Sequence, residues 1–268
     1  MTSLVLHDDA KIIIERLSAR LPHAVLLGGV RGIGLHTIAR RIAAAHTKTI
    51  LELGESEDTI GIDTIRQLYN QLRTKHSEYV VVILDDADTM TLEAQNAFLK
   101  LLEEPGDHIS FILTSHMPTR LLPTIASRVQ QYLLPPPTQD STKAILAKSD
   151  ADTIKKGQIG FISQGLPAEM MRLLHDDAYF ELTSESMKSA KKFIEETAYG
   201  KLLIAYRYGT DRVKAGIFLD ALQVLLRHSL VRAPQLKTAQ TLAAVVHAHE
   251  KLQENGHVRT QLLKIVFD

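Results

Sequence analysis

One segment near the start of the chain constrains the fold more than any other. Residues 25–40 read VLLGGVRGIGLHTIAR, which is an apolar run, a glycine-rich turn and the beginning of a helical pattern. Gly29 and Gly34 have the spacing of the G-x-x-x-x-G-K-[ST] pattern, in which backbone N–H groups surround a phosphate and a helix N-terminus adds a positive dipole. The segment predicts a buried strand, a loop of the phosphate-binding type that also contains Gly32, and a helix.

The two positions of this pattern that carry chemistry hold unsuitable residues. Leu35 replaces the lysine that contacts the phosphates, and His36 replaces the hydroxyl that holds Mg²⁺. A lysine–phosphate contact contributes roughly 1.5–3 kcal/mol, and imidazole is a poor ligand for a hard cation. Thr37 does not restore the hydroxyl, because one further residue along a helix turns the side chain by about 100°. The sequence therefore predicts weak or no nucleotide binding; the alternative is a tight strand-to-helix turn with no ligand role.

Length and composition limit the class of protein. With 268 residues, the chain is expected to contain two or three modules. A formal net charge of zero argues against binding nucleic acid through overall charge, although it leaves a local basic strip open. The absence of cysteine excludes disulfides and thiolate zinc sites, and no other metal site is expected. No segment has the pattern of a signal peptide or a membrane span, so we expect a cytoplasmic protein.

Strands and helices alternate through the first half of the chain. We expect strands at residues 25–28, 49–53, 79–84 and 109–114, and helices at residues 8–21, 35–46, 62–72 and from Thr91 onward. The β-branched run at residues 79–84 is typical of a strand buried on both faces of a parallel sheet. Ligands of such sheets bind beyond the carboxyl ends of the strands, where the glycine loop, Asp85 and Ser115 are expected to meet.

Three consecutive prolines at residues 135–137 form the clearest boundary in the chain. Beyond them we expect no strand, but several short helices up to residue 176 and longer helices afterwards. Turns are expected at three glycines, Gly157, Gly160 and Gly165. Apolar residues four apart predict one face of a long helix: Val213, Ile217, Ala221 and Leu225.

Several segments together resemble the AAA+ subunits of bacterial DNA polymerase III clamp loaders, in particular the delta-prime type and its gamma/tau relatives. The most diagnostic segment is residues 85–105, DDADTMTLEAQNAFLKLLEEP, which is similar to the family's E-A-Q-N-A-L-L-K-x-L-E-E-P helix after an acidic strand end. Residues 121–129, LLPTIASRV, resemble the family segment that ends in Ser-Arg-Cys, with Val129 in place of the cysteine. The resemblance covers the first half of the chain, whereas the rest matches only in length and helical character.

The resemblance implies an α/β fold in three parts. These are an AAA+ P-loop domain with a parallel sheet (residues 1–137), a small helical lid (138–176) and an all-helical collar that serves oligomerisation (177–268). It also implies a nucleotide-independent subunit of the DNA polymerase III holoenzyme, in which Arg128 reaches the ATP γ-phosphate of an adjacent motor subunit. The implied partners in this hetero-oligomer are gamma/tau subunits, a delta-like subunit, the sliding clamp and primed DNA, while the neighbours hold ATP and Mg²⁺.

Departures from the family pattern fall at the chain's own nucleotide site. Besides Leu35 and His36, Asp86 stands where an active motor has glutamate, and Ala168 stands where the lid carries a phosphate-sensing arginine. The family's zinc-binding cysteines are absent. These losses predict that the isolated chain has no ATPase activity.

Alternatives stay open for single residues and for the function. Asp85 is either a remnant metal position, which its place beside a glycine loop favours, or a solvated strand-end carboxylate. Ser115 is either a sensor-type polar group or a turn residue, and Arg128 taken without the resemblance is a surface residue. The rival functions are an ATP-hydrolysing gamma/tau-type motor with an atypical loop and a stand-alone AAA+-fold DNA-binding adaptor.

Overall fold

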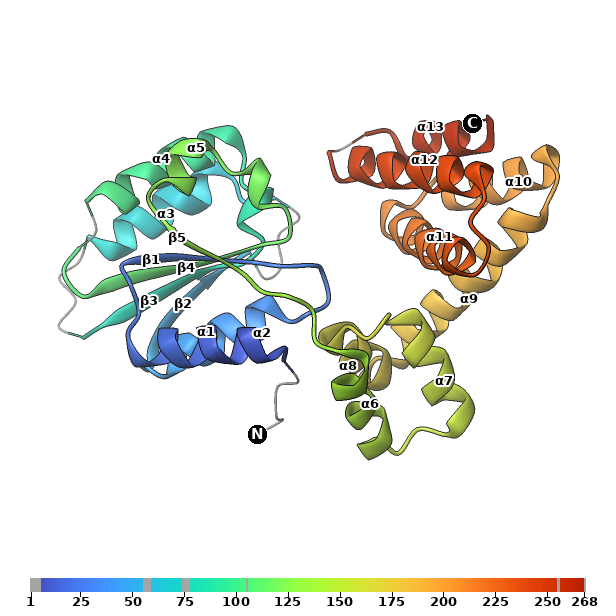
Figure 1. Ribbon diagram of the computed structural model, residues 1–268. Helices are drawn as coiled ribbons and strands as arrows, with labels where there is room; N and C mark the ends of the chain where they lie inside the picture. The colour runs from blue at the N-terminus through green and yellow to red at the C-terminus, as the bar shows by residue number, and fades with distance from the viewer. Residues whose placement is uncertain (1–5, 55–58, 74–77, 105, 255, 268) are drawn as a thin grey trace. The chain divides into compact units, whose positions relative to one another are not determined.

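The computed structural model describes residues 6–54, 59–73, 78–104, 106–254 and 256–267, and the chain forms two compact units (Figure 1). The sheet unit comprises residues 1–148 together with residues 165–169, and the helical unit comprises residues 149–164 and 170–268. The division into an AAA+ domain, a lid and a collar at residues 137 and 176 stays a prediction.

The sheet unit contains a five-stranded sheet with the order β2-β3-β4-β1-β5, in which every neighbouring pair is parallel. Its strands are β1 (Ala24–Gly28), β2 (Thr49–Leu53), β3 (Val80–Leu84), β4 (Ile109–Ser115) and β5 (Gln130–Leu133). Gly28 lies opposite Ser115, and Leu84 lies opposite Leu113. The carboxyl ends of β1, β3 and β4 therefore reach the same edge of the sheet, as the alternating pattern predicts.

Strand β5 was missing from the sequence-based expectation. Its residues are mostly exposed, and its sequence, QQYL, begins with two polar residues instead of an apolar run. It pairs only with β1, at the edge of the sheet, so burial on both faces places no demand on its side chains. The other four strands lie within one residue of the predicted bounds.

Helices cover both faces of the sheet (Figure 1). On one face lie α1 (Asp8–Ala19) and α2 (Leu35–Ala44), and on the other lie α3 (Ile62–Leu72), α4 (Leu92–Glu103) and the short α5 (Pro123–Ala126). Alternate residues of β3 enter different cores: Val81 and Ile83 pack with α1 and α2, whereas Val82 packs with α3 and α4. Full burial of each such side chain contributes roughly 1.5–3 kcal/mol, so the β-branched run stabilises both layers.

Helix α4 is fixed at its cap and in its first turn. The hydroxyl of Thr91 accepts a hydrogen bond from the Ala94 amide (3.2 Å), which confirms the predicted N-cap. The buried side chain of Gln95 donates to the carbonyls of Met90 and Arg120 (3.3 Å each) and accepts from the Leu122 amide (2.8 Å). These bonds hold the segment that leads to Arg128 against α4.

The described residues beyond the prolines form helices and no strand, as predicted. They are α6 (Gln139–Lys148), α7 (Thr153–Ile162), α8 (Pro167–His175), α9 (Asp177–Glu195), α10 (Ala198–Tyr208), α11 (Arg212–Arg232), α12 (Leu236–Gln253) and α13 (Val258–Phe267). The core of the helical unit joins α9 to α13, with Phe218 stacked on Tyr208 at a ring-centroid distance of 4.4 Å and edge-on to Phe193. No described helix has the length and apolar character needed to span a membrane.

Two details of the helical prediction were wrong. Gly157 and Gly160 lie inside α7, and of the three glycines only Gly165 turns the chain, with a φ of 79°. On α11 the residues four apart do not share a buried face, because four steps of about 100° leave a drift of roughly 40°. Val213 is 69% exposed. The buried face instead consists of Ala215, Phe218, Leu219, Ala221, Leu222 and Leu226.

Candidate functional site

The glycine loop between β1 and α2 has the backbone conformation that its glycines allow. Gly32 and Gly34 both have a φ of 90°, a left-handed value that is costly for residues with a Cβ. Gly34 precedes the first residue of α2 and gives that helix no side-chain cap. The segment therefore forms the strand, the glycine turn and the helix that the sequence predicts.

The side chain of Ile33 packs against Gly29 within this loop. A Cβ built on Gly29 would lie 2.4 Å from Cδ1 of Ile33, a residue that is only 4% exposed. The Gly29 amide donates to the carbonyl of Ser115 (3.2 Å), and the Ile33 amide donates to the carbonyl of Val30 (3.4 Å). The Gly29 amide thus continues the β1–β4 ladder, and the Ile33 amide is bonded within the loop itself.

The outer side of the loop is bound by the beginning of α8. The Gly32 carbonyl accepts hydrogen bonds from the amides of Ala168 (2.8 Å) and Glu169 (3.4 Å). A Cβ built on Gly32 would meet Cβ of Leu166 and of Glu169 at 3.2 Å, and one built on Gly34 would meet Cβ of Ala168 at 3.5 Å. Ala168 therefore lies beside the glycine loop and presents a methyl group there.

The first turn of α2 is also engaged by the protein itself. Leu35 is 2% exposed and belongs to the core between α1, α2 and the sheet. Nε2 of His36 is 2.8 Å from Oε2 of Glu52 on β2, and Nε of Arg40 is 3.1 Å from Oε1 of the same carboxylate. The side chains at the lysine and hydroxyl positions of the pattern thus serve packing and an ion-pair cluster.

Beyond β3, a threonine hydroxyl holds the acidic strand end. Oγ1 of Thr114 donates to Oδ1 of Asp85 (2.6 Å) and accepts from the amide of Asp86 (3.0 Å). Asp86 has φ 46° and ψ 49°, a left-handed conformation uncommon for a residue with a side chain. Sequence reasoning missed Thr114, although a polar residue at the end of an apolar strand was a usable signal. The structure shows that this residue is fully buried.

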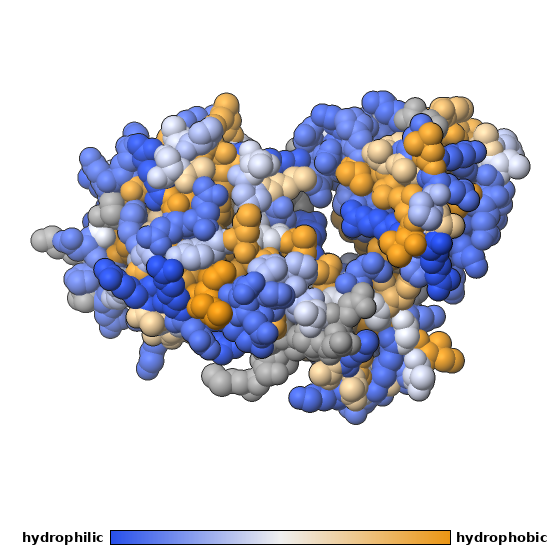
Figure 2. Space-filling view, viewed as in Figure 1, coloured by the Kyte–Doolittle hydropathy of each residue, from blue (hydrophilic) through white to orange (hydrophobic). Residues whose placement is uncertain are grey.

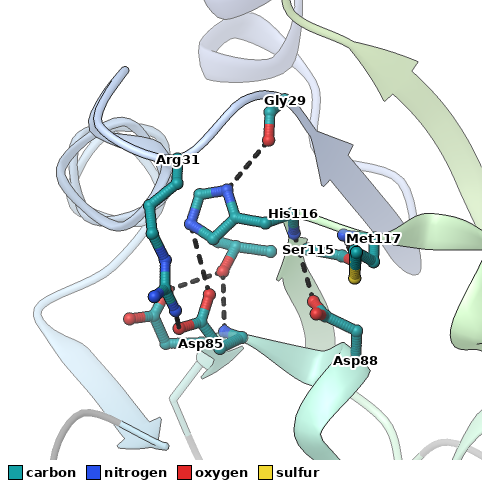
Figure 3. A network of polar contacts seen from close by, with 9 residues as sticks. Gly29, Arg31, Asp85, Asp88, Ser115, His116 and Met117 are labelled. Carbon is teal, nitrogen blue, oxygen red and sulfur yellow. Dashed lines mark hydrogen bonds and ion pairs between the residues drawn. The ribbon is translucent and has the colours of Figure 1, made fainter. Parts of the chain in front are cut away.

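His116 joins the glycine loop to this acidic segment, and Figure 3 shows its ring between them. Its Nδ1 is 2.8 Å from the Gly29 carbonyl, its amide donates to Oδ1 of Asp88 (3.1 Å), and its Nε2 is 3.3 Å from Oδ1 of Asp86. A guanidinium nitrogen of Arg31 lies 3.6 Å from Asp86. Burial raises the pKa of the Asp86 carboxyl, and the neighbouring His116 ring opposes that rise. Sequence reasoning missed His116 as well.

Ser115 lies at the same edge but faces a different partner. Its hydroxyl accepts from the Met117 amide (3.1 Å), and its carbonyl accepts from the Gly29 amide. The structure thus brings Gly29, Asp85 and Ser115 together beyond the carboxyl ends of β1, β3 and β4. Among the described residues, no group of histidines and carboxylates has the arrangement of a metal site.

Arg128 lies apart from these residues. It precedes β5, and because β5 runs parallel to β1, Arg128 lies at the amino edge of the sheet, opposite the glycine loop. Its guanidinium is 2.8 Å from Oε1 of Glu103 and donates to the carbonyl of Thr124 (2.9 Å). The side chain is 38% exposed.

Comparison with known proteins shows which family the chain resembles. The family model for "DNA polymerase III, delta subunit" matches residues 39–138. DNA polymerase III subunit delta' of Pseudomonas aeruginosa is 30% identical over 208 residues, which cover 66% of this chain and 63% of that protein. This chain is similar to the delta-prime type of DNA polymerase III clamp-loader subunits. The gamma/tau subunit of Mycobacterium tuberculosis H37Rv is 31% identical over 172 residues, or 53% of this chain and 29% of that protein. The matched part of the chain therefore spans less than two thirds of these relatives.

Solved structures confirm the α/β AAA+ fold. A DNA polymerase III gamma subunit-related protein from Thermotoga maritima has a TM-score of 0.58 with this chain at 18% identity, and the match covers 97% of this chain and 98% of that protein. A single-residue variant of RuvB from Thermotoga maritima has a TM-score of 0.50 at 15% identity, covering 96% and 85%. At these identities the likeness concerns the fold alone.

Proposed function

We propose that this chain is a non-catalytic, delta-prime-like subunit of a bacterial DNA polymerase III clamp loader. It hydrolyses no ATP itself, presents Arg128 to the ATP of an adjacent gamma/tau-type motor subunit, and helps to load the sliding clamp on primed DNA in the cytoplasm. Its partners in the hetero-oligomer are gamma/tau and delta-like subunits, the clamp and the DNA, and the neighbouring subunits hold ATP and Mg²⁺.

The observation that carries this proposal is the set of residues in the glycine loop and the first turn of α2. Ile33 packs against Gly29, two loop amides donate to protein carbonyls, and Leu35 offers no charge to a phosphate. His36 is bound to Glu52 and supplies no hydroxyl for Mg²⁺. These residues do not fit ATP with Mg²⁺, because the position of the phosphate-binding lysine holds a buried leucine and the position of the metal-binding hydroxyl holds a histidine paired with a carboxylate.

The position of Arg128 supports a role toward another chain. Its guanidinium lies at the sheet edge opposite the chain's own loop and is partly exposed. A guanidinium keeps its charge and presents a planar fork of donors that suits a phosphate. Its ion pair with Glu103 is a surface contact of the kind that contributes about 0–1 kcal/mol, so exchanging it for a phosphate costs little.

Reconstitution of the full complex tests the proposal. The complete chain is combined with a gamma/tau-type motor, a delta-like subunit, the clamp and primed DNA, and the stimulated ATPase rate is measured. We expect Arg128→Ala to lower that rate at least about tenfold, a cautious fraction of the 10³–10⁵ that arginine fingers supply. Arg128→Lys should recover only part of the rate, because lysine restores the charge without the fork.

A matched control separates catalysis from stability. Glu103→Gln removes the same ion pair but leaves the guanidinium in place, so the rate should stay near the wild-type value. Equal losses of ATPase rate in Glu103→Gln and Arg128→Ala would mean that the rate falls because the ion pair is broken, and not because the guanidinium is missing from the neighbour's ATP. A wild-type rate in an assembled Arg128→Ala complex would remove the trans-acting role.

Two rival functions have direct tests. Low-micromolar binding of a fluorescent ATP analogue, with Mg²⁺-dependent turnover by the isolated chain, would favour a working gamma/tau-type motor. Failure to co-purify with clamp-loader subunits, together with DNA binding by the chain alone, would favour a stand-alone adaptor.

A further inference from the structure

His116 lies where three segments of the sheet unit meet. It follows β4, its ring contacts the glycine loop after β1, and it contacts both Asp86 and Asp88 after β3. The side chain is 20% exposed. A single residue thus links the ends of three neighbouring strands on the edge of the sheet where the glycine loop lies (Figure 3).

The chemistry of the imidazole decides how this link works. A carbonyl oxygen can only accept, so Nδ1 of His116 carries a hydrogen and donates it to Gly29. The Nε2 atom lies 3.3 Å from Oδ1 of Asp86, which is an ion-pair distance when the ring is protonated. The ring therefore contacts both segments: Nδ1 is hydrogen-bonded to the loop carbonyl, and Nε2 lies beside the Asp86 carboxylate.

We propose that His116 ties the glycine loop to the acidic end of β3 and thereby keeps the loop in one conformation without a ligand. In a nucleotide-binding loop, phosphate and metal would join these two segments from outside the protein. Here the joining group is a side chain of the protein itself. This inference rests on the proposed function only in that the loop takes no nucleotide; the tie belongs to the isolated chain.

The remaining contacts of the loop assign the tie a specific task. The bond from the Gly29 amide to Ser115 extends the β1–β4 ladder by one residue, and the bonds from Ala168 and Glu169 hold Gly32. Neither set reaches β3. Among the described contacts, residues 29–34 reach Asp86 in two ways. One is the ion pair of Arg31, whose side chain is 71% exposed and lies 3.6 Å from Asp86, and the other passes through the ring of His116.

Amide hydrogen exchange of the full-length chain tests the tie. The exchange rates of residues 29–36 are measured by mass spectrometry or NMR for the wild type and for His116→Ala. We expect the variant to exchange at least about tenfold faster there, because it loses the hydrogen bond to the Gly29 carbonyl and the contact with Asp86 that join the loop to the end of β3. His116→Asn can keep a donor for the Gly29 carbonyl but cannot reach Asp86, so it should fall between the two.

The control is His46→Ala, which removes another half-buried imidazole bonded to a backbone carbonyl of the same unit, that of Leu17 (2.7 Å). It should leave the exchange of residues 29–36 unchanged. The tie is refuted if His116→Ala exchanges like the wild type in this segment, or if exchange rises equally throughout the sheet unit. Slower exchange of the wild-type loop on adding ATP with Mg²⁺ would also refute it.

These outcomes are independent of clamp loading. A faster-exchanging loop in His116→Ala supports the tie even if Arg128→Ala has no effect on the reconstituted ATPase. Conversely, a strong effect of Arg128→Ala leaves the proposed function intact even if His116→Ala exchanges like the wild type.

Discussion

At the scale of single residues, the two ends of the glycine loop are held by different means. Gly29 is bonded to Ser115 and His116, whereas Gly32 is bonded to the first amides of α8. Of these two residues, only Gly32 needs to be glycine because of its backbone conformation, since its φ is 90°. A substitution there tests backbone strain and close packing together.

We expect Gly32→Ala to destabilise the protein by at least about 1–2 kcal/mol, the usual cost of a left-handed conformation for a residue with a Cβ. The added Cβ would also come within 3.2 Å of Leu166 and Glu169. Gly157→Ala is the opposite case, because Gly157 lies inside α7 and its added Cβ meets nothing within 4 Å. It should stabilise by about 0.4–1 kcal/mol. Urea unfolding measures both, and two changes of the same sign would contradict this account.

At the scale of elements, sequence reasoning worked where burial dictates the residue type. Strands β1, β3 and β4 were predictable because parallel strands buried on both faces need apolar runs, and the half-buried edge strand β2 was predictable because its sequence, TILEL, is still mostly apolar. Strand β5 was not, because an edge strand tolerates the polar Gln130 and Gln131. The buried face of α11 was misjudged because a spacing of four residues drifts around a helix.

The candidate site was predictable to a similar extent and for a related reason. Strand order and motif spacing place Gly29, Asp85 and Ser115 at one sheet edge, as the structure does. Spacing does not tell which neighbouring polar side chain crosses to another segment. That depends on rotamers and on the strained backbone of Asp86, so Thr114 and His116 emerged only from the structure.

An ion pair between α7 and α9 gives a pH-dependent prediction. The hydrogen bond and the charge of Lys155 lower the pKa of Asp177, and the two side chains are 2.7 Å apart. A carboxylate with a lowered pKa in the folded state stabilises it above the unfolded pKa of about 3.8, and this contribution is lost as pH falls below that value. Asp177→Asn should therefore slightly lower the melting temperature at pH 7, with the difference from wild type shrinking toward pH 3.

The effect should be small, because Asp177 is exposed and solvent screens the pair. It should shrink further in 1 M salt. Glu181→Gln makes the same charge change at an exposed position of α9 and serves as the control. A difference that persists unchanged from pH 7 to pH 3 would show that the substitution acts through helix packing and not through this charge.

At the scale of the whole molecule, each unit has its own hydrophobic core. Among the described residues, the two cores on the faces of the sheet contain none from α9 to α13, and the core of the helical unit contains none from the strands. Apolar side chains nevertheless reach the surface of the helical unit (Figure 2). On α10, Tyr199 is 70% exposed and Leu203 is 55% exposed, one turn apart on the same face. Exposed aromatic and aliphatic groups of this kind are typical of protein interfaces.

If the helical unit binds neighbouring subunits, polar substitutions on this face of α10 should weaken the assembly. We expect the double variant Tyr199→Ser with Leu203→Ser to keep the wild-type circular dichroism and melting behaviour, because neither side chain belongs to the core. Its affinity for the gamma/tau-type subunit, measured on a sizing column over a dilution series, should fall at least about tenfold, since truncating one well-packed interface residue already costs about 1 kcal/mol or more. Val231→Ser, at an 85% exposed position of α11, should assemble normally. Wild-type assembly by the double variant would exclude this face, whereas equal losses in both would indicate that any exposed serine substitution on these helices weakens assembly.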